Sequence, residues 1–326
     1  MTEATRLPLF APPTPLQPSR ALAETLDLAA LWFKRDDLIP FGFGGNKIRG
    51  LEWIVADALQ QGADTLVTGA GVLSNHVRAT ASVAASVGLR TRAVYWGSAP
   101  EELRGNHLLV RMLGAEVVFT ESTDRASVDD FLASEAEQLT RDGHHPYVIP
   151  RGGACPLGVL GHVHAVREVL EQFSPTAELP EAIVLAAGSG GTLTGWLLGS
   201  ALCNAPWNIY GVSVSRSREE VCENVLRLGR QTAKEHNLDA AIRKNDLHVY
   251  DTHIGSGYGI PSSAGNQAIT AVAKSEGIFL DPTYTGKAFA WLIDAVRQGF
   301  LREQRVLFVH SGGEPALFAS LAEHVE

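Results

Sequence analysis

The sequence of 326 residues has few cysteines, no long apolar run and no excess of basic residues. Its three cysteines, Cys155, Cys203 and Cys222, are widely spaced and form no Cys-x-x-Cys pair, which argues against a zinc ribbon or a disulfide framework. Glycine, proline or charge interrupts every apolar stretch, so we expect no membrane span. We also expect no metal site. The amino-terminal segment lacks the apolar core of a secretory signal, so we expect a cytoplasmic protein with reduced thiols.

Charge and composition exclude further classes of protein. The formal net charge of -9 argues against a surface for nucleic acid or for an anionic membrane. Hydrophobic residues at 45% and charged residues at 19% are typical of a globular protein and exclude global disorder. The 32 glycines follow no three-residue period, which excludes collagen, and they gather in short clusters instead. The length suggests about two domains.

Apolar strand-like segments alternate with helical patterns along most of the chain. Two such series predict an α/β protein of two lobes, each a largely parallel sheet flanked by helices, with a ligand cleft between the lobes. The proline-rich residues 8–18 indicate an extended arm, and residues 174–180 a linker. Strands are expected at residues 65–68, 91–96, 116–119, 146–149, 182–186, 209–214 and 306–310. Helices are expected at residues 47–58, 75–87, 101–113, 126–141, 219–235, 263–275 and 286–298, and after Gly191.

A glycine-rich turn, Gly44-Gly45-Asn46-Lys47, places a lysine at the start of a predicted helix. Such a turn lets the backbone approach a ligand closely. A lysine held in a cleft loses hydration, which lowers its pKa and lets it form a Schiff base with an aldehyde. A solvated surface lysine after a turn is the alternative, and from this motif alone it is the commoner case.

Two further clusters lie between a strand and a helix, where free backbone N–H groups bind anions. Ser74-Asn75-His76 adds side-chain donors and suits a substrate carboxylate, although an ordinary helix N-cap explains the same residues. Gly188-Ser189-Gly190-Gly191-Thr192 forms a compact nest that suits a phosphate, with a structural tight turn as the alternative. The nest is not a dinucleotide fingerprint because position 193 is Leu193, and it lacks the Walker lysine.

Three later loops could bring hydroxyl groups to the cleft. Tyr258 and Tyr284 each lie in a glycine-flanked loop, where a tyrosine serves acid–base chemistry or simply packs. Ser311 follows the last predicted strand, where it faces the cleft or caps the last helix. A turn-held lysine, two anion nests and these loops together fit a phosphate-bearing aldehyde cofactor and an amino-acid carboxylate.

The combined motifs resemble the fold-type II pyridoxal-phosphate enzymes, which have the two-lobed fold of the tryptophan synthase β chain. Within them the sequence is similar to the branch of D-cysteine desulfhydrase and 1-aminocyclopropane-1-carboxylate deaminase. The resemblance covers nearly the whole chain. The matching stretches, in family order, are residues 34–37, 44–47, 74–78, 105–106, 113–116, 188–192, 257–259, 281–288 and 310–313.

The resemblance implies a role for each matching residue. Lys47 would bind pyridoxal 5'-phosphate covalently and move protons. Ser74, Asn75 and His76 would bind the substrate carboxylate, with Asn75 also near the cofactor. Tyr258 and Tyr284 would flank the substrate, so the expected catalytic residues are Lys47, Ser74, Tyr258 and Tyr284. The phosphate would lie on Gly188, Ser189, Gly190, Gly191 and Thr192, and the ring nitrogen would meet Ser311.

The resemblance also implies the reaction: β-elimination from a small amino acid, with D-cysteine converted to pyruvate, sulfide and ammonia as the leading expectation. Thr285 replaces the Glu, and His76 the Gln, of the deaminase pattern, and both differences favour the desulfhydrase side. Ala79 and the loop from Arg151 to Pro156 depart from both patterns near the substrate side. The alternatives are therefore a 1-aminocyclopropane-1-carboxylate deaminase, an L-cysteate sulfo-lyase and a specialised β-elimination or β-replacement enzyme.

The family organisation predicts that residues 50–151 form a small domain. Residues 1–49 and 152–326 would form the large, cofactor-binding domain. A homodimer is expected because family members commonly form one. A non-catalytic binding protein on the same fold is a rival from another class, and an aldehyde-reactive lysine argues against it.

Overall fold

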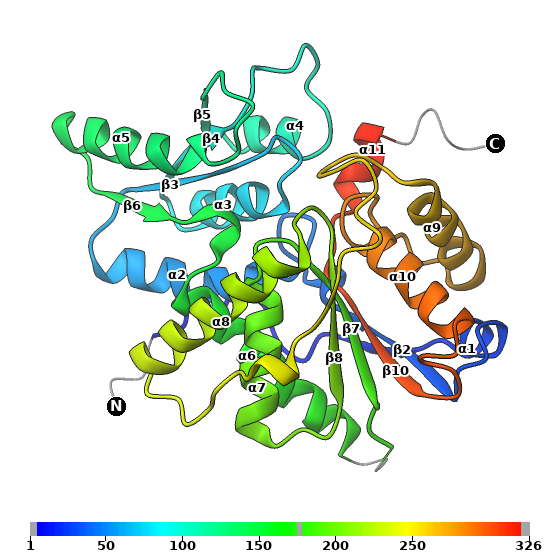
Figure 1. The fold of residues 1–326 in the computed structure, drawn as a ribbon. Helices are drawn as coiled ribbons and strands as arrows, with labels where there is room; N and C mark the ends of the chain where they lie inside the picture. The colour runs from blue at the N-terminus through cyan, green and yellow to red at the C-terminus, as the bar shows by residue number, and fades with distance from the viewer. Residues whose placement is uncertain (1–4, 175–177, 321–326) are drawn as a thin grey trace.

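Two sheets flanked by helices form the two lobes of the molecule (Figure 1). The structure is a computed structural model that describes residues 5–174 and 178–320. All paired strands run parallel except one edge pair of the larger sheet, so the expected α/β class with largely parallel sheets is confirmed.

The larger sheet has six strands in the order β1-β2-β10-β7-β8-β9, and only β1 is antiparallel to its neighbour. Its strands are apolar on both faces because helices cover both. In β10, Val306 and Phe308 pack with α1, α9 and α10, whereas Leu307 and Val309 pack with α6, α7 and α8. The strands are β1 (Leu16–Pro18), β2 (Ala30–Arg35), β7 (Ala182–Ala187), β8 (Asn208–Ser213), β9 (His248–Tyr250) and β10 (Arg305–His310).

The smaller sheet has four parallel strands in the order β5-β4-β3-β6. Successive residues of β4 again serve opposite faces. Ala93 and Tyr95 pack with α3 and α4, and Val94 packs with α5. The strands are β3 (Thr65–Ala70), β4 (Arg90–Tyr95), β5 (Glu116–Phe119) and β6 (Pro146–Ile149).

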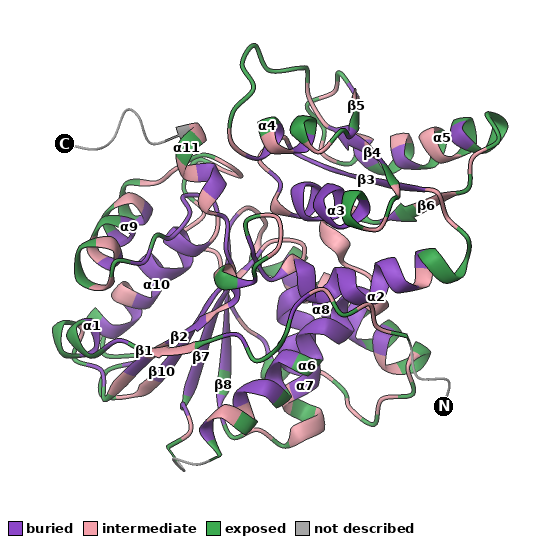
Figure 2. Cartoon of the chain, turned by 180° about the vertical axis from the view of Figure 1, so that it is seen from behind, coloured by how far each residue is buried: buried purple, intermediate pink, exposed green. Residues whose placement is uncertain are grey.

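The helices form layers on both sheets, with their buried faces toward the strands (Figure 2). The α-helices are α1 (Arg20–Thr25), α2 (Lys47–Gln60), α3 (Asn75–Ser86), α4 (Gly105–Met112), α5 (Ser127–Arg141), α6 (Pro156–Phe173), α7 (Gly191–Cys203), α8 (Arg218–Glu235), α9 (Ser263–Glu276), α10 (Thr285–Arg297) and α11 (Leu317–Ser320). Short 3-10 helices are η1 (Asp36–Leu38), η2 (Arg151–Gly153), η3 (Lys244–Asp246) and η4 (Glu314–Ala316).

Helices α2 and α6 approach each other through glycine. A Cβ at Gly161 would lie 2.1 Å from the carbonyl oxygen of Arg49, so no other residue fits there without moving a backbone. This close approach brings the start of α2, and with it Lys47, next to η2.

A network of charged side chains, which we call the paired cluster, joins the amino-terminal arm to α2 and α6. It consists of Lys34, Asp36, Arg49 and Glu168, all buried or nearly so. The guanidinium of Arg49 binds both oxygens of Asp36 at 2.8 and 2.7 Å and both oxygens of Glu168 at 2.9 and 3.0 Å. The ammonium of Lys34 donates to Glu168 and to the carbonyl oxygen of Thr14. Two positive charges therefore face two negative charges with their hydrogen bonds made.

Most predicted elements lie within two residues of the observed ones. The helix expected at 101–113 is partly wrong, because α4 begins only at Gly105. Strands β1, β2 and β9, helices α1 and α6 and the four 3-10 helices were not predicted. Proline and glycine at the start of α6 disguise it, and β1 is the end of the expected proline-rich arm. Residues 174–180 connect α6 to β7, and residues 175–177 lie outside the described part of the chain.

The membership of the two sheets supports the predicted division of the chain. All strands of the smaller sheet fall within residues 65–149, and all strands of the larger sheet fall outside them. We propose that residues 50–151 form the small domain and residues 1–49 with 152–326 the large one, although α2 runs through the boundary at residue 49. No helix among the described residues is both long and apolar enough to cross a membrane.

Candidate active site

A pocket lies between the two sheets, at the carboxyl ends of their parallel strands, where ligands bind in such folds. Residues of both lobes line it, as in many small-molecule sites. Gly191 lies just outside it, beside Lys47 and Thr192 in an adjoining cavity. The other predicted site residues all line the pocket: Lys47, Ser74, Asn75, His76, Gly188, Ser189, Gly190, Thr192, Tyr258, Tyr284 and Ser311.

Lys47 is the first residue of α2, and its Nζ donates to the carbonyl oxygen of Gly152 at 3.0 Å. Burial lowers the pKa of Lys47 to about 8, so a sizeable fraction of the amine is neutral near pH 7.5. It is therefore not a solvated surface lysine. The preceding turn is fixed from two sides. Gly45 N donates to the carbonyl oxygen of Asp36, and Asn46 N donates to that of Ser311, both at 3.0 Å.

The start of α3 offers backbone donors to the pocket. Ser74 is the N-cap, and its Oγ accepts from Val77 N at 3.3 Å, so the N-cap interpretation is confirmed even though Ser74 lines the pocket. The N–H groups of Asn75 and His76, in the first turn, have no partner inside the helix. They can bind a carboxylate, which the helix dipole also favours.

A chain of hydrogen bonds sets the Asn75 side chain. Arg78 Nε donates to Asn106 Oδ1 at 2.9 Å, which fixes the orientation of the Asn106 amide. Asn106 Nδ2 then donates to Asn75 Oδ1 at 2.8 Å. Because its oxygen is occupied, Asn75 keeps its Nδ2 donors for a ligand.

The ring of His76 is neutral and its roles are assigned by its neighbours. Burial, with a smaller effect of the positive charge of Lys47, lowers the pKa of His76 to about 3. Its Nε2 lies 3.0 Å from Thr68 Oγ1, and that hydroxyl donates to the carbonyl oxygen of Ile149. Nε2 is thus the donor, and Nδ1 is left with a lone pair. The backbone N–H of His76, rather than its ring, is the group suited to a carboxylate.

The second anion nest is the turn between β7 and α7. Gly190, the N-cap of α7, has φ of 95°, a backbone conformation that favours glycine, and no side chain caps the helix. The first N–H groups of α7 are therefore open to a ligand. Thr192 Oγ1 accepts from Asn46 Nδ2 at 3.0 Å, which joins this turn to the turn that carries Lys47.

The two tyrosines meet across the pocket. Their hydroxyl oxygens lie 2.8 Å apart, and their rings pack edge to face with centroids 5.9 Å apart. Burial raises the pKa of Tyr258 to about 12 and raises that of Tyr284 well above its ordinary value. Both therefore stay protonated near neutral pH. One hydroxyl donates to the other, which leaves one proton for a pocket ligand.

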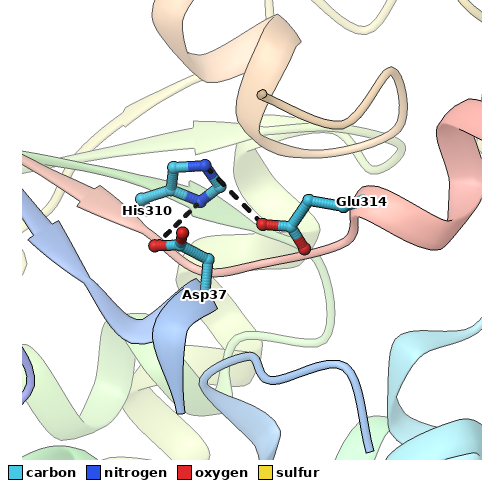
Figure 3. Close-up of side chains that lie close together, drawn as sticks. All are labelled: Asp37, His310 and Glu314. Carbon is cyan, nitrogen blue, oxygen red and sulfur yellow. Dashed lines mark ion pairs between the residues drawn. The ribbon is translucent and has the colours of Figure 1, made fainter. Parts of the chain in front are cut away.

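Three side chains lie close together next to the loop that carries Ser311: His310, Asp37 and Glu314 (Figure 3). Nε2 of His310 donates to the carbonyl oxygen of Phe279 at 3.0 Å, and Nδ1 accepts from Gly312 N at 3.3 Å. Burial lowers the pKa of His310, so the ring is neutral. Both ring nitrogens are engaged, so the trio supports the loop and lacks a free nitrogen ligand for a metal ion.

Thr285, which favoured the desulfhydrase side at the level of sequence, does not line the pocket. Its Oγ1 donates to Asp281 Oδ1 and accepts from Asp281 N, both at 2.7 Å. The side chain closes the turn before α10 and is fully buried. Any effect of Thr285 on substrate choice therefore acts through the position of the neighbouring Tyr284.

Sequence reasoning did not single out three arginines that also line the pocket, Arg125, Arg151 and Arg216. They come from loops far apart in the chain, so no local motif contains them. The departure of the loop from Arg151 to Pro156 from the family pattern is the one signal that pointed to this region.

The fold and the pocket define a class of protein: a two-lobed α/β protein that brings a buried lysine amine and an uncapped helix start to one pocket. Residues 7–312 match the family model described as pyridoxal-phosphate dependent enzyme. The chain belongs to this family, and its cofactor is pyridoxal 5'-phosphate.

Individual relatives narrow the resemblance. The chain is 39% identical over 325 residues to D-cysteine desulfhydrase of Salmonella typhi, covering 98% of this chain and 97% of that protein. A crystal structure described as an ACC deaminase homologue has a TM-score of 0.89 and 38% identity, covering 97% of this chain and 94% of the other. A fungal L-serine ammonia-lyase from Rhizomucor miehei, at a TM-score of 0.66 and 18% identity with 92% of this chain and 93% of the other covered, shares the fold.

The residues present fit the cofactor. The uncapped start of α7 is a cradle for its phosphate, and a Cβ at Gly188 would lie 3.2 Å from the Tyr284 ring, so the narrow turn suits glycine. The Lys47 amine lies in the same pocket and is partly neutral. We propose that Lys47 holds the aldehyde, residues 188–192 the phosphate, and Ser311 and Asn75 the ring.

Proposed function

We propose that this chain catalyses β-elimination from a small α-amino acid, with D-cysteine, giving pyruvate, sulfide and ammonia, as the first substrate to test. The observation that carries the proposal is the meeting, in one pocket, of the Lys47 amine, the phosphate cradle of α7 and the open start of α3. The names of the relatives support the choice of D-cysteine. The ACC deaminase homologue supports ring-opening deamination as a second candidate.

Pyridoxal phosphate supplies an aldehyde that bonds to amines and a conjugated ring that draws electron density from the substrate Cα. The chain supplies the geometry and the proton transfers. The start of α3 holds the substrate carboxylate with the N–H groups of Asn75 and His76. This contact fixes which bond of Cα faces the Lys47 amine, which takes the α-proton.

The far side of the pocket serves the leaving group. The Tyr258–Tyr284 pair keeps one O–H available, so it can donate a hydrogen bond to a departing thiolate. Ser311 offers the cofactor ring a neutral hydroxyl, which does not hold a positive charge on the ring as a carboxylate would. Elimination suits this arrangement because the negative charge leaves with the β-substituent. The 2-aminoacrylate released is hydrolysed by water to pyruvate and ammonia.

The experiment is to compare the purified holoenzyme with Lys47→Ala and Lys274→Ala. Lys274 is an exposed lysine on α9, so it is the matched control. Loss of the Lys47 amine should remove the covalently bound cofactor absorbance and borohydride labelling, and lower kcat by about 10²–10⁴-fold. Retention of both in Lys47→Ala would refute the assignment of Lys47.

Products identify the reaction. Sulfide and pyruvate from D-cysteine support elimination, and 2-oxobutyrate from 1-aminocyclopropane-1-carboxylate supports ring opening. Absence of ammonia from every small amino acid offered, with the cofactor bound, would sink the proposed function.

We further propose that the protein is a cytoplasmic homodimer. Leu108 and Met112 lie one turn apart on α4, and Phe318 lies on α11, which packs against α4. All three are exposed and apolar, which supports burial of this face by a second copy. Light scattering on the eluted holoenzyme tests it, because Met112→Asp should convert a dimer to a monomer.

A further inference from the structure

Three arginine side chains, which we call the arginine cluster, line the pocket from both lobes. Arg125 lies in the loop between β5 and α5, and Arg151 begins η2 after β6, so both come from the smaller sheet. Arg216 lies between β8 and α8 on the larger sheet. The topology thus brings three positive charges from separate segments to one cavity.

Aromatic rings hold Arg125 in place. Its guanidinium carbon lies 5.7 Å from the Trp96 ring centroid and 5.4 Å from the Tyr258 ring centroid. Within residues 5–174 and 178–320, no carboxylate lies within 4 Å of its nitrogen atoms. Stacking on a ring fixes the plane of the guanidinium and leaves its edge N–H groups for a ligand.

Arg151 links η2 to α5 and to the loop that carries Arg125. Its Nε and one terminal nitrogen bind the two oxygens of Asp129 at 2.7 and 2.6 Å. Its other terminal nitrogen donates to the carbonyl oxygen of Arg125 at 2.8 Å. Asp129 therefore balances one of the three positive charges and holds the Arg125 loop at the pocket.

Arg216 is half-buried, and none of the carboxylates in the described parts of the chain forms an ion pair with it. Burial lowers the pKa of Arg216, and the positive charge of Arg151 lowers it further. Glu220 opposes this, and Arg125 (lowering) and Asp129 (raising) have smaller effects. The cluster therefore has more positive charge than the protein neutralises. Such an excess beside a cavity favours an anionic ligand.

The anions already assigned to the pocket have their own sites. Backbone N–H groups at the start of α7 suit the cofactor phosphate, and those at the start of α3 suit the substrate α-carboxylate. Both of these sites are built from backbone N–H groups, and Tyr258, which stacks on Arg125, belongs to the leaving-group side. Arg125 thus lies on the side of the pocket where the β-substituent would lie, and Arg216, which lines the same pocket, lies near enough for the positive charge of Arg125 to act on it.

We propose that the preferred substrate carries a second anionic group, a tetrahedral oxyanion on its β-carbon, and that Arg125 and Arg216 bind it. A guanidinium group can bind a sulfonate or a phosphate through two parallel hydrogen bonds, so the cluster suits either oxyanion. The inference rests on the proposed function and names its substrate class. For a β-sulfonate, the Cα–H bond breaks with its proton going to Lys47, and the Cβ–S bond breaks with both electrons leaving on sulfite. The net reaction consumes one water and gives pyruvate, ammonium and bisulfite.

A binding measurement tests the inference without turnover. Isothermal titration calorimetry on the holoenzyme would compare 3-sulfopropanoate with butanoate, which lacks the sulfonate. We expect 3-sulfopropanoate to bind about 10–100-fold more tightly, as charge-assisted hydrogen bonds allow, with the advantage shrinking at high salt. Equal affinities for the two probes would overturn the inference.

Variants show which residues cause the higher affinity for 3-sulfopropanoate. Arg125→Gln and Arg216→Gln should each reduce the ratio of the two affinities about tenfold, whereas Arg230→Gln on the exposed face of α8 should keep it. The cofactor phosphate is the other anion that the cluster could serve. If Arg216→Gln weakens pyridoxal-phosphate binding and leaves the ratio unchanged, the cluster serves the cofactor and the inference is wrong.

Turnover then identifies the oxyanion. Both enantiomers of cysteate, cysteine and O-phosphoserine would be compared by kcat/KM, with sulfite, sulfide, phosphate and pyruvate as readouts. We expect kcat/KM for cysteate or O-phosphoserine to exceed that for cysteine. A higher value for cysteine with no anion selectivity would overturn the inference and keep the proposed function. Tight binding of 3-sulfopropanoate without ammonia release from any substrate would overturn the proposed function and keep the oxyanion site.

Discussion

The paired cluster and the arginine cluster both gather charge in the interior, but only one of them is balanced. In the paired cluster, Arg49 and Lys34 face Asp36 and Glu168, and their hydrogen bonds are made within the protein. In the arginine cluster, three guanidinium groups have Asp129 as their one ion-pair partner within the described residues. The first holds segments of the fold together, and the second leaves charge for a ligand.

The difference shows why burial alone does not identify a site. Lys34 and Lys47 are both lysines with lowered pKa values, and burial is the largest cause in each. Lys34 has two carboxylates nearby that oppose the effect, whereas Lys47 donates to a carbonyl oxygen. The missing counter-charge, rather than the burial, distinguishes Lys47, which we propose holds the cofactor, from the structural Lys34.

The largest effect is expected from breaking the paired cluster. Glu168→Gln keeps the volume but leaves Lys34 and Arg49 with one carboxylate, so the free energy of unfolding should fall by about 3–5 kcal/mol. Urea unfolding of the holoenzyme measures it. Glu171→Gln, on the exposed side of the same helix, is the control and should change little. A loss no larger than the control's would mean that the cluster is not a stabilising network.

Glu314 is an acidic residue whose charge the protein also leaves unbalanced. Its buried Oε2 has no hydrogen-bond partner. Burial, with Asp37 and Asp281 nearby, raises its pKa from 4.5 to about 7. A raised carboxyl pKa stabilises the fold below pH 4.5, and this stabilisation is lost as pH rises through about 7. Glu314→Gln should therefore be more stable than the parent at pH 8, by at most about 3.5 kcal/mol for a pKa change from 4.5 to about 7 at ~1.4 kcal/mol per unit, and equal to it below pH 4.5.

Urea midpoints at pH 5 and pH 8 measure the effect of Glu314. If the difference between Glu314→Gln and the parent does not grow with pH, the carboxyl is not held neutral by the fold.

A ligand that balances the arginine cluster should stabilise the fold. At a concentration 100 times its Kd, 3-sulfopropanoate should raise the free energy of unfolding by about 2.7 kcal/mol. The shift in unfolding midpoint measures this. The same concentration should stabilise Arg216→Gln less, and equal stabilisation of parent and variant would place the ligand elsewhere.

The smallest effect is expected from removing a charge of the arginine cluster without ligand. Arg216→Gln loses no ion pair and relieves repulsion from Arg151 and Arg125, so stability should stay within about 0.5 kcal/mol or rise slightly. Thermal unfolding of the ligand-free holoenzyme checks it. A loss comparable to that of Glu168→Gln would remove the contrast between the clusters.

Much of the fold and the centre of the site could be predicted from sequence. Strands such as β5 and β6 match their predicted bounds because short apolar runs between turns are strong local signals. Lys47 and residues 188–192 could be proposed from sequence because each is a compact motif, and Lys47 lines one pocket with Gly188, Ser189, Gly190 and Thr192. Helix α6 was missed because Gly158 and Gly161, which weaken a helix locally, serve its contact with α2.

Residue types and local order therefore determined the α/β class, the family and the candidate cofactor residues, since these depend on neighbours in the chain. Only the tertiary structure decided which groups meet. Burial in the folded protein keeps the His76 ring neutral, and the Thr285 hydroxyl hydrogen-bonds to Asp281 instead of lining the pocket. The fold also brings Arg125, Arg151 and Arg216 to one pocket. The physical reason is that burial and charge balance depend on segments distant in sequence, so no local pattern contains them.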